Sequence, residues 1–367
     1  MVSSAHSFSN WSMIRSISTV QAQDEGKMSN QTVSIVKVQG NVKGAILEAI
    51  GRIGGIVLSP ASKVAIKPNL CTFMGPETGA TTDVEIIEAI VELINREESS
   101  CRIFIVESRS LSGKATEKFR RLGYADLEVK YDNVKLVDLD RDETYNVLFS
   151  ENERLKIVKV PETLMMSNYL ISVAKLKTSD QQKISCILKN QFGCIPGKKE
   201  GYHPWLSQAI VDASYVFRPD LCVIDGIFSM EGKGPTGGNP KRMNIIIAGK
   251  NPVATDTVAA RVMGFDPKTV PHLKRAAKRE FSLKGDVDVV GENIDNIREK
   301  FLFIPSYAYL TLRLSDYIQR MAGRLERFGE LIFLAGAFLS NAREYWPMLR
   351  RLSLPEIRRE IQERRIK

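Results

Sequence analysis

Histidine is scarce in this chain and paired cysteines are absent, so two large classes of metal site are excluded. The 367 residues include three histidines and five cysteines, and no two cysteines form a Cys-x-x-Cys pair. Zinc knuckles, ferredoxin-type clusters and histidine-rich centres need such ligands at close spacing. An intrinsic iron–sulfur cluster is therefore not expected. Scattered, unpaired thiols are instead typical of a protein of the reducing cytoplasm.

Long apolar runs are also missing. No stretch reaches the roughly 20 apolar residues that a transmembrane helix needs, and the apolar run at 331–339 is short. The serine-rich N-terminus has no apolar core like that of a signal peptide. We predict that residues 1–30 form a disordered extension, with Met28 as an alternative start, and that the protein is cytoplasmic.

The common nucleotide-binding fingerprints are absent as well. No Gly-x-Gly-x-x-Gly follows the first predicted strand, which argues against a nicotinamide-dependent dehydrogenase, and the glycines at 232–238 lack the order of a Walker loop. The net charge is +9, but residues 301–367 hold 12 basic and 7 acidic residues, so most of the excess lies there. The remainder is only mildly basic, and no nucleic-acid partner is expected.

Short β-branched runs alternate with helical patterns between residues 31 and 300. Several runs are continuously apolar, as in strands that are covered on both faces. We predict an α/β domain over 31–300 with a mainly parallel, doubly wound sheet. The predicted strands are 33–38, 64–67, 103–107, 134–139, 155–160, 169–174, 221–224 and 243–248.

Two helices of this domain have clear start signals. Thr82 followed by Glu85 has the spacing of a capping box, and apolar residues then recur at helical intervals. Asn251 and Pro252 are typical of an N-cap and a first turn, and Gly264 ends this second helix. Both helices follow a predicted strand, as the α/β pattern requires.

The amino-acid composition changes at about residue 301. The segments 312–327 and 354–366 have helical patterns, and the second combines an apolar stripe with a basic face. We predict a C-terminal all-helical extension, a basic amphipathic tail over 301–367. Two interpretations remain: a helical cap whose basic face is solvated, or a segment that contacts an anionic membrane or another protein.

Acidic residues mark the end of one predicted strand. The segment 225–240 begins after an apolar run and contains Asp225 and Glu231 among glycines and prolines, which is typical of a ligand-binding loop. Asp256 lies on an apolar face of the second helix, where a carboxylate needs a cation, a metal or several hydrogen bonds. The three carboxylates are candidate ligands of Mg²⁺ or another divalent cation, and candidate acid–base groups.

Lysines and amides follow other predicted strands. Lys67 ends one strand, and the loop after it leads to a helix N-terminus, which favours anions. Lys175 and Lys177 extend another strand, where a period of two aims both at one side. We predict that these groups bind a small anionic substrate. The predicted binding residues are Lys67, Asn69, Thr81, Thr82, Lys175, Lys189 and Asn190, and the predicted catalytic residues are Asp225, Glu231, Asp256 and Lys177.

An ordered set of short motifs resembles the family called domain of unknown function 362. The motifs are Lys67-Pro68-Asn69-Leu70, Thr81-Thr82-Asp83, Glu107-Ser108, Lys175-Leu176-Lys177-Thr178, Leu188-Lys189-Asn190, Phe192-Gly193-Cys194, Asp225-Gly226, Met230-Glu231-Gly232, Gly234-Pro235-Thr236, Asp256, Ala259-Ala260-Arg261 and Met263-Gly264-Phe265-Asp266-Pro267. The resemblance implies a cytoplasmic α/β domain, often associated with iron–sulfur proteins. This chain departs from the pattern by lacking a Cys-x-x-Cys module, and by having Ser179 where relatives commonly have histidine.

Three functions are compatible with these observations. The first is an enzyme that acts on a small anionic substrate with a carboxylate-bound divalent metal. The second is an iron–sulfur-associated redox accessory protein that works with a ferredoxin-type partner, to which Cys186 or Cys194 would contribute a ligand. The third is a non-catalytic binding protein that docks through its basic tail, which would make it peripheral to a membrane.

Overall fold

The computed structural model describes residues 31–148, 157–278 and 286–306. The strands are β1 (Thr32–Lys37), β2 (Lys63–Pro68), β3 (Arg102–Glu107), β4 (Val134–Asp138), β5 (Thr144–Leu148), β6 (Ile157–Pro161), β7 (Tyr169–Ser179), β8 (Lys183–Ser185), β9 (Leu221–Glu231), β10 (Asn239–Gly249) and β11 (Asp288–Gly291). The α-helices are α2 (Val42–Gly51), α3 (Val84–Glu97), α4 (Ala115–Arg121), α5 (Ala125–Lys130), α6 (Glu162–Met165), α7 (Ile187–Gln191), α8 (Leu206–Val216), α9 (Pro252–Val262), α10 (Pro271–Ala276) and α11 (Ile294–Ile297).

A mixed, mostly parallel sheet forms the centre of the described fold. Its strand order is β11-β1-β10-β9-β7-β2-β3-β4, and β8 pairs with β7 outside this path. The neighbours from β9 to β4 are all parallel, whereas β10 is antiparallel to both β1 and β9. The predicted α/β class with a mainly parallel sheet is confirmed. β5 and β6 form a separate antiparallel pair.

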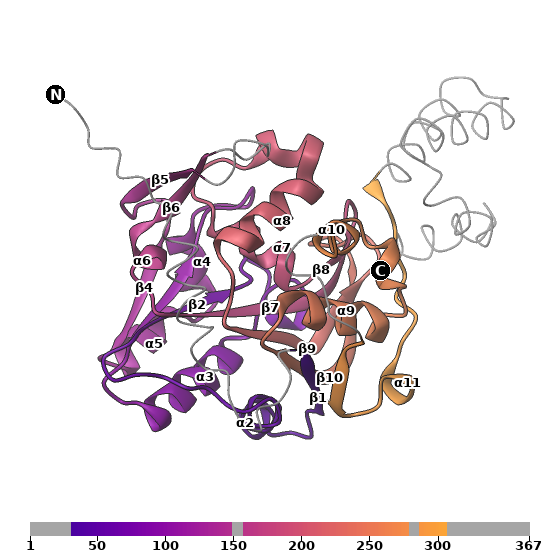
Figure 1. Cartoon of the computed structure of the whole chain (residues 1–367), viewed down its shortest axis with the longest axis horizontal. Coiled ribbons are helices and arrows are strands. Elements are labelled where there is room, and N and C mark those ends of the chain that lie inside the picture. Colours follow the sequence, from indigo (N-terminus) through magenta and orange to yellow (C-terminus); the bar gives the residue numbers. More distant parts are fainter. Residues whose placement is uncertain (1–30, 149–156, 279–285, 307–367) are drawn as a thin grey trace, which may run out of the picture. The chain divides into compact units, whose positions relative to one another are not determined.

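Helices cover both faces of this sheet (Figure 1). One core contains buried residues of α2, α3, α4 and α5, and the other contains those of α7, α8, α9 and α10. Successive strand residues alternate between the two cores: Ile171 and Val173 of β7 pack in the first, and Leu170 and Ala174 in the second. The continuously apolar strands are thus explained by burial on two sides, which is a doubly wound arrangement.

The two predicted helix starts differ in outcome. Asn251 caps α9 and accepts hydrogen bonds from the backbone amides of residues 253 and 254, as predicted. At α3 the prediction of Thr82 as the cap is wrong, because Asp83 occupies that position and accepts from the amide of Glu85. The Thr82 hydroxyl instead donates to the carbonyl of Val173 in β7. The side chain of Thr82, which the capping-box spacing assigned to the helix, is therefore used in a contact with the sheet.

The segment predicted as a loop from residue 225 is in fact largely strand. β9 continues through Asp225 to Glu231 and forms a hairpin with β10, with a register shift between Arg242 and Ile245. The turn itself contains the glycines that the sequence shows at 232–238. The strand continues because β10 supplies a partner for it, and that pairing is not visible in the local composition.

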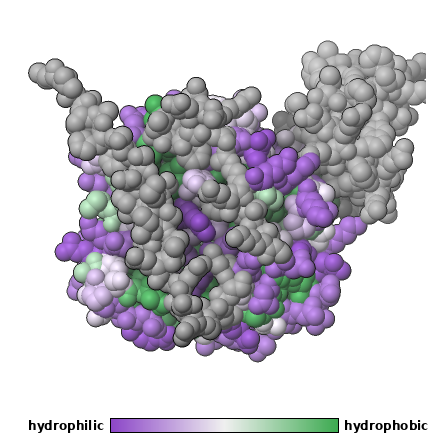
Figure 2. Space-filling model, in the orientation of Figure 1, coloured by the Kyte–Doolittle hydropathy of each residue, from purple (hydrophilic) through white to green (hydrophobic). Residues whose placement is uncertain are grey.

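Several predicted features lie outside the described residues. These are the disordered extension at 1–30, the first residues of the predicted strand 155–160, and the C-terminal helices of the basic tail. The chain divides into two compact units, Met1–Phe303 and Ile304–Lys367, and the predicted domain boundaries remain predictions. Within the described residues, no helix is long and apolar enough to cross a membrane. Hydrophilic residues cover much of the visible described surface in Figure 2.

Candidate functional site

The carboxyl ends of β2 and β7 meet where the strand order reverses. β3 and β4 follow on one side of β2, whereas β7 pairs with its other side. Open α/β sheets bind ligands at such switch points. Lys67 lies near the end of β2, and Lys175 and Lys177 lie in the second half of β7. The fold therefore brings three predicted lysines to one edge of the sheet.

Two of these lysines are paired with buried carboxylates. Lys67 Nζ lies 2.7 Å from Glu107 Oε2, at the end of β3. Lys175 Nζ lies 2.7 Å from Asp225 Oδ2 on β9. The side chains of both pairs are almost fully buried. Their charges are therefore balanced within the protein.

Lys177 has neutral partners instead. Its ammonium donates to Asn69 Oδ1 at 2.8 Å and to the carbonyl of Ala80 at 2.5 Å, and it lies 3.2 Å from Cys71 Sγ. The residue is fully buried. In the part of the chain that the structure describes, no carboxylate lies within ion-pair distance of this ammonium. A buried positive charge without a counter-charge is costly, and in this respect Lys177 differs from Lys67 and Lys175.

Lys189 adds a second ammonium group that forms no ion pair among the described residues. It lies on α7 and is half-buried, and its side chain makes no hydrogen bond or ion pair with any described residue. Burial lowers the pKa of Lys189, and the nearby charge of Lys177 lowers it further. Cys71 and Asp180 act in the opposite direction. The Lys177 ammonium thus contacts a partly exposed thiol, and the Lys189 ammonium is close enough for its pKa to respond to the charges of both groups.

Amide and hydroxyl groups hold these elements together. The side-chain amide of Asn190 donates to the carbonyl of Lys67 at 3.0 Å and to Ser172 Oγ at 3.1 Å, so it bridges β2 and β7. Asn69 donates to Asn190 Oδ1 at 3.3 Å. We call Lys67, Asn69, Cys71, Lys175, Lys177, Lys189 and Asn190 the switch-point site. Thr81 and Thr82 lie beside it, but their hydroxyls donate to the carbonyls of Met74 and Val173 and shape the loop.

Two further lysines, Lys118 and Lys199, lie near Lys67 and Glu107, and the sequence did not predict them. Lys118 is fully buried and donates to the carbonyl of Ser108, and Lys199 donates to Ser108 Oγ at 2.8 Å. Burial lowers the pKa of both amines, that of Lys199 to about 8, against the opposing charge of Glu107. Glu107 was detectable, since it ends a predicted strand at the ligand-binding edge. The two lysines lie on a helix and in a connection, where no local pattern marks them.

Asp256 is held by hydrogen bonds, one of the three alternatives predicted for a carboxylate on an apolar helix face. Its oxygens accept hydrogen bonds from the amides of Ile187 at 2.7 Å and Leu188 at 3.0 Å. Burial raises the pKa of Asp256 to about 7, although these two amides counteract it. His272 Nε2 lies 3.9 Å from Asp256 Oδ2, but burial lowers the pKa of His272 to about 3 and neither ring nitrogen has a hydrogen-bond partner. The two side chains are therefore not an ion pair at neutral pH.

The three carboxylates predicted as metal ligands do not form one ligand set. Asp225 is occupied by Lys175 and Asp256 by backbone amides, while Glu231 accepts from the amide of Leu302 and lies 3.7 Å from Lys241 Nζ. Among the described residues, no group of three or more histidine, cysteine, aspartate or glutamate side chains is arranged to hold a metal ion. The donor set does not fit the predicted ion.

The predicted cluster ligands Cys186 and Cys194 are both fully buried. Burial also raises the pKa of the Cys186 thiol. A buried, protonated thiol is a poor ligand for a cluster on another protein. Cys71 alone among the five cysteines is partly exposed, and it lies at the switch-point site.

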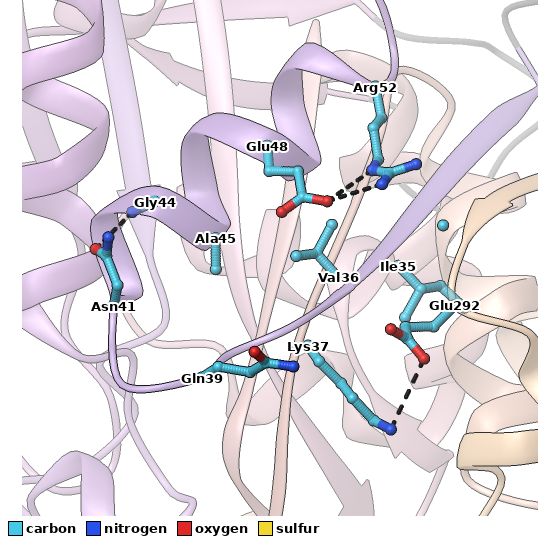
Figure 3. A pocket seen from close by; sticks show the side chains of 11 residues that line it. Ile35, Val36, Lys37, Gln39, Asn41, Gly44, Ala45, Glu48, Arg52 and Glu292 are labelled. Atoms are coloured by element: carbon cyan, nitrogen blue, oxygen red, sulfur yellow. Dashed lines mark hydrogen bonds and ion pairs between the residues drawn. The ribbon is translucent and has the colours of Figure 1, made fainter.

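A cavity of about 450 Å³ lies elsewhere, between the end of β1, the helix α2 and the residues after β11. Figure 3 shows its polar lining, in which Lys37 faces Glu292 and Arg52 faces Glu48. These charges neutralise each other, so nothing in the lining calls for a charged ligand. The lysines without ion pairs therefore indicate a ligand site more strongly than this cavity does.

A family model, a curated relative and a solved structure each match part of this chain. The family model described as a domain of unknown function (DUF362) matches residues 64–261, which include every residue of the switch-point site. A thylakoid-associated protein of Synechocystis sp. is 27% identical over 258 residues, which cover 66% of this chain and 77% of that protein. The lactate racemase apoprotein from Thermoanaerobacterium thermosaccharolyticum has a TM-score of 0.36 and 10% identity, over 65% of this chain and 59% of that chain.

Proposed function

This chain belongs to the family described as a domain of unknown function (DUF362), and we propose that it is an enzyme that binds a small anionic molecule at the switch-point site. The observation that carries this proposal is the pair Lys177 and Lys189, whose ammonium groups form no ion pair among the described residues, although the charge of Asp180 partly offsets that of Lys189. Leaving a desolvated ammonium without a counter-charge costs several kcal/mol. A bound anion would offset that cost, which makes the pair a site for an oxyanion.

The ligand class follows from the donors. Lysine ammonium groups bind carboxylate or phosphate oxygens as compact point charges. Asn69 is already oriented by Lys177, so its amide is fixed at the edge of the site. We infer a small molecule that carries one carboxylate or phosphate, held between the two lysines with Cys71 alongside.

A proton-transfer role for the lysines is part of the proposal. A lysine whose pKa is lowered by burial and by a second cation exchanges protons more readily near neutral pH than an exposed lysine does. Lys189 meets this condition, and Lys177 supplies the second cation. In this proposal Lys177 holds the anion and Lys189 gives or takes the proton. The three-carboxylate metal site is not part of it, because the donors are otherwise engaged.

Alkylation of Cys71 tests the proposal, because the other four cysteines are buried. Iodoacetate is anionic and iodoacetamide is neutral, and both form a thioether with loss of iodide. We expect iodoacetate to be favoured at Cys71 by about tenfold relative to a small free thiol, and inorganic phosphate or acetate to protect the thiol. The relative protection by these two anions distinguishes a phosphate site from a carboxylate site. Equal preference in the folded protein and in a free thiol would refute an anion site here.

A second candidate function is association with a membrane surface through residues 301–367. It is favoured by the net positive charge of this segment and by the thylakoid association printed in the name of the Synechocystis relative. We propose that the full chain binds vesicles containing anionic lipid and not neutral vesicles. Replacing Arg358, Arg359, Arg364 and Arg365 with glutamine should reduce co-sedimentation strongly. Unchanged binding of that variant would contradict docking through the tail.

A further inference from the structure

The helix α7 lacks an N-terminal cap of its own. It has only five residues, and its N-cap position is Cys186, whose side chain makes no capping hydrogen bond. Cysteine is not among the residues that usually cap helices. The first amides of a helix have no partner within it, and here they are buried, so they need an acceptor from elsewhere.

Asp256 supplies that acceptor from another helix. It lies in α9, and its two carboxylate oxygens accept one amide each, from Ile187 and from Leu188. The side chain is fully buried. α9 has its own cap at Asn251 and does not depend on these bonds. The contact is therefore a clamp by which a well-anchored helix holds a short one.

The clamped helix carries two residues of the switch-point site. Lys189 directly follows the second clamped amide, and Asn190 comes next and bridges β2 and β7. A five-residue helix has little stability by itself. Asp256 holds its first amides, Asn190 ties its other end to β2 and β7, and Ser214 donates to the carbonyl of Leu188 between them.

We propose that Asp256 is a positioning residue of the anion site: by holding the first two amides of α7, it fixes where Lys189 stands relative to Lys177. This inference rests on the proposed function, and it assigns Asp256 a role in place of the metal ligation predicted from the sequence. Asp256 touches no ligand in this arrangement. It acts on anion binding only through α7.

The test compares Asp256→Asn with Asn251→Ala. Asparagine offers one acceptor oxygen and a donor amide, so one α7 amide loses its partner. Asn251→Ala removes the cap of α9 and is expected to lower Tm by a similar amount, but it leaves α7 clamped. Hydrogen exchange at residues 187 and 188 and the rate of reductive methylation of Lys189 report the position of α7 without any ligand. The alkylation preference of Cys71 and the Kd for phosphate or acetate report the anion site.

We expect Asp256→Asn to accelerate exchange at both amides, to raise the methylation rate of Lys189 and to weaken anion binding about tenfold. Asn251→Ala should change none of these. In a Lys189→Met background, Asp256→Asn should weaken anion binding no further, because the lysine that it positions is gone. A purely structural role would instead give the same weakening in both backgrounds.

Slow exchange and unchanged methylation in Asp256→Asn would overturn the inference, whatever the anion results are. An unselective Cys71 in the wild-type protein would refute the proposed function, while the two ligand-free measurements still decide whether Asp256 positions Lys189. The failure of one proposal is thus separable from the failure of the other.

Discussion

Lys67 at the end of β2 and Glu107 at the end of β3 form a buried ion pair in which one carboxylate serves three donors. Glu107 Oε2 accepts from Lys67 Nζ at 2.7 Å and from the amide of Leu70 at 2.9 Å, and Oε1 accepts from the amide of Ser108 at 2.9 Å. This pair fixes the loops after two neighbouring strands. Lys177, only one strand away, has no such partner, and the contrast separates a structural lysine from a candidate binding lysine.

Glu107→Gln should destabilise the fold by about 3–5 kcal/mol, because it leaves the buried ammonium of Lys67 unpaired. Urea unfolding measures this change. Glu292→Gln is the matched control, since its ion pair with Lys37 is long and solvent-exposed, and it should change stability by less than about 0.5 kcal/mol. Comparable losses in the two variants would contradict the assignment of Glu107 as a structural partner.

Lys177→Met should separate stability from binding. Removal of a desolvated charge compensates for the lost hydrogen bonds, so the free energy of unfolding should change by about 1 kcal/mol or less. The Kd for phosphate or acetate, measured by calorimetry, should rise at least about tenfold. The control is Lys241→Met, a lysine at the far end of the β9–β10 hairpin. Wild-type affinity in Lys177→Met would remove this lysine from the anion site.

Anion binding should be accompanied by proton uptake by Lys189. Burial and Lys177 lower the pKa of this amine, and a bound anion would shift it back toward its ordinary value of 10.5. Between the lowered and the restored pKa, each binding event then takes up a fraction of a proton. Calorimetry in buffers of different ionisation enthalpy measures that fraction. Lys189→Met should abolish it, and uptake that persists in this variant would show that another group is responsible.

The buried pair of Asp256 and His272 should shape the pH dependence of stability. The pKa of Asp256 is raised from 3.8 to about 7, so its contribution to stability is present below pH 4 and is lost as the pH rises toward 7. The pKa of His272 is lowered from 6.5 to about 3, so its contribution is present above pH 6.5 and is lost as the pH falls toward 3. Between pH 4 and 6.5 the two slopes oppose each other.

The variant Asp256→Asn lacks the contribution of Asp256 to this pH dependence. As the pH rises from 4 to 6.5, the stability of the variant relative to that of the wild-type protein should therefore increase by about 1.4 kcal/mol per pH unit. The thiols of Cys186 and Cys222 near this carboxyl stay protonated over this window, because burial raises the pKa of both. Urea unfolding at several pH values measures the difference. Parallel profiles for the two proteins would show that Asp256 titrates normally.

Gly79 should not tolerate a side chain. Its φ is +74°, and a Cβ atom there would lie about 2.2 Å from the carbonyl oxygen of Ser229. Gly79→Ala should therefore cost more than about 2 kcal/mol and disturb the neighbouring carbonyl of Ala80, which accepts from Lys177. At Gly51 a Cβ meets nothing within 4 Å, so Gly51→Ala should be neutral or slightly stabilising. Similar Tm values for both variants would contradict this close approach.

Much of the fold was predictable because its signals are local. Continuously apolar, β-branched runs indicated strands buried on two faces, and Asn251 with Pro252 indicated the start of α9. The strands β5, β8 and β11 were not predicted, because they are short, and β11 also depends on pairing with β1, which is distant in the sequence. The length of β9 was also underestimated, since only its pairing with β10 extends it through Asp225 to Glu231.

The sequence predicted which residues lie at the candidate site, but it did not predict which lysine pairs with which carboxylate. Residues such as Lys67, Lys177 and Asp225 follow or extend strands, so a common edge was expected. Which lysine meets which carboxylate depends on strand order, and the order β9-β7-β2-β3 places Asp225 beside Lys175 and Glu107 beside Lys67. The same order leaves Lys177 without a counter-charge among the described residues.

By itself, the sequence determined the α/β class, the family, and the collection of lysines and amides at strand ends, because hydrophobic periodicity and short motifs act over a few residues. Only the tertiary structure decided that Asp256 clamps α7, that Asp225 and Glu231 have separate partners, and that Cys71 lies beside Lys177. Charges interact through space, and the distances between them are set by strand order and helix packing, which no local pattern encodes.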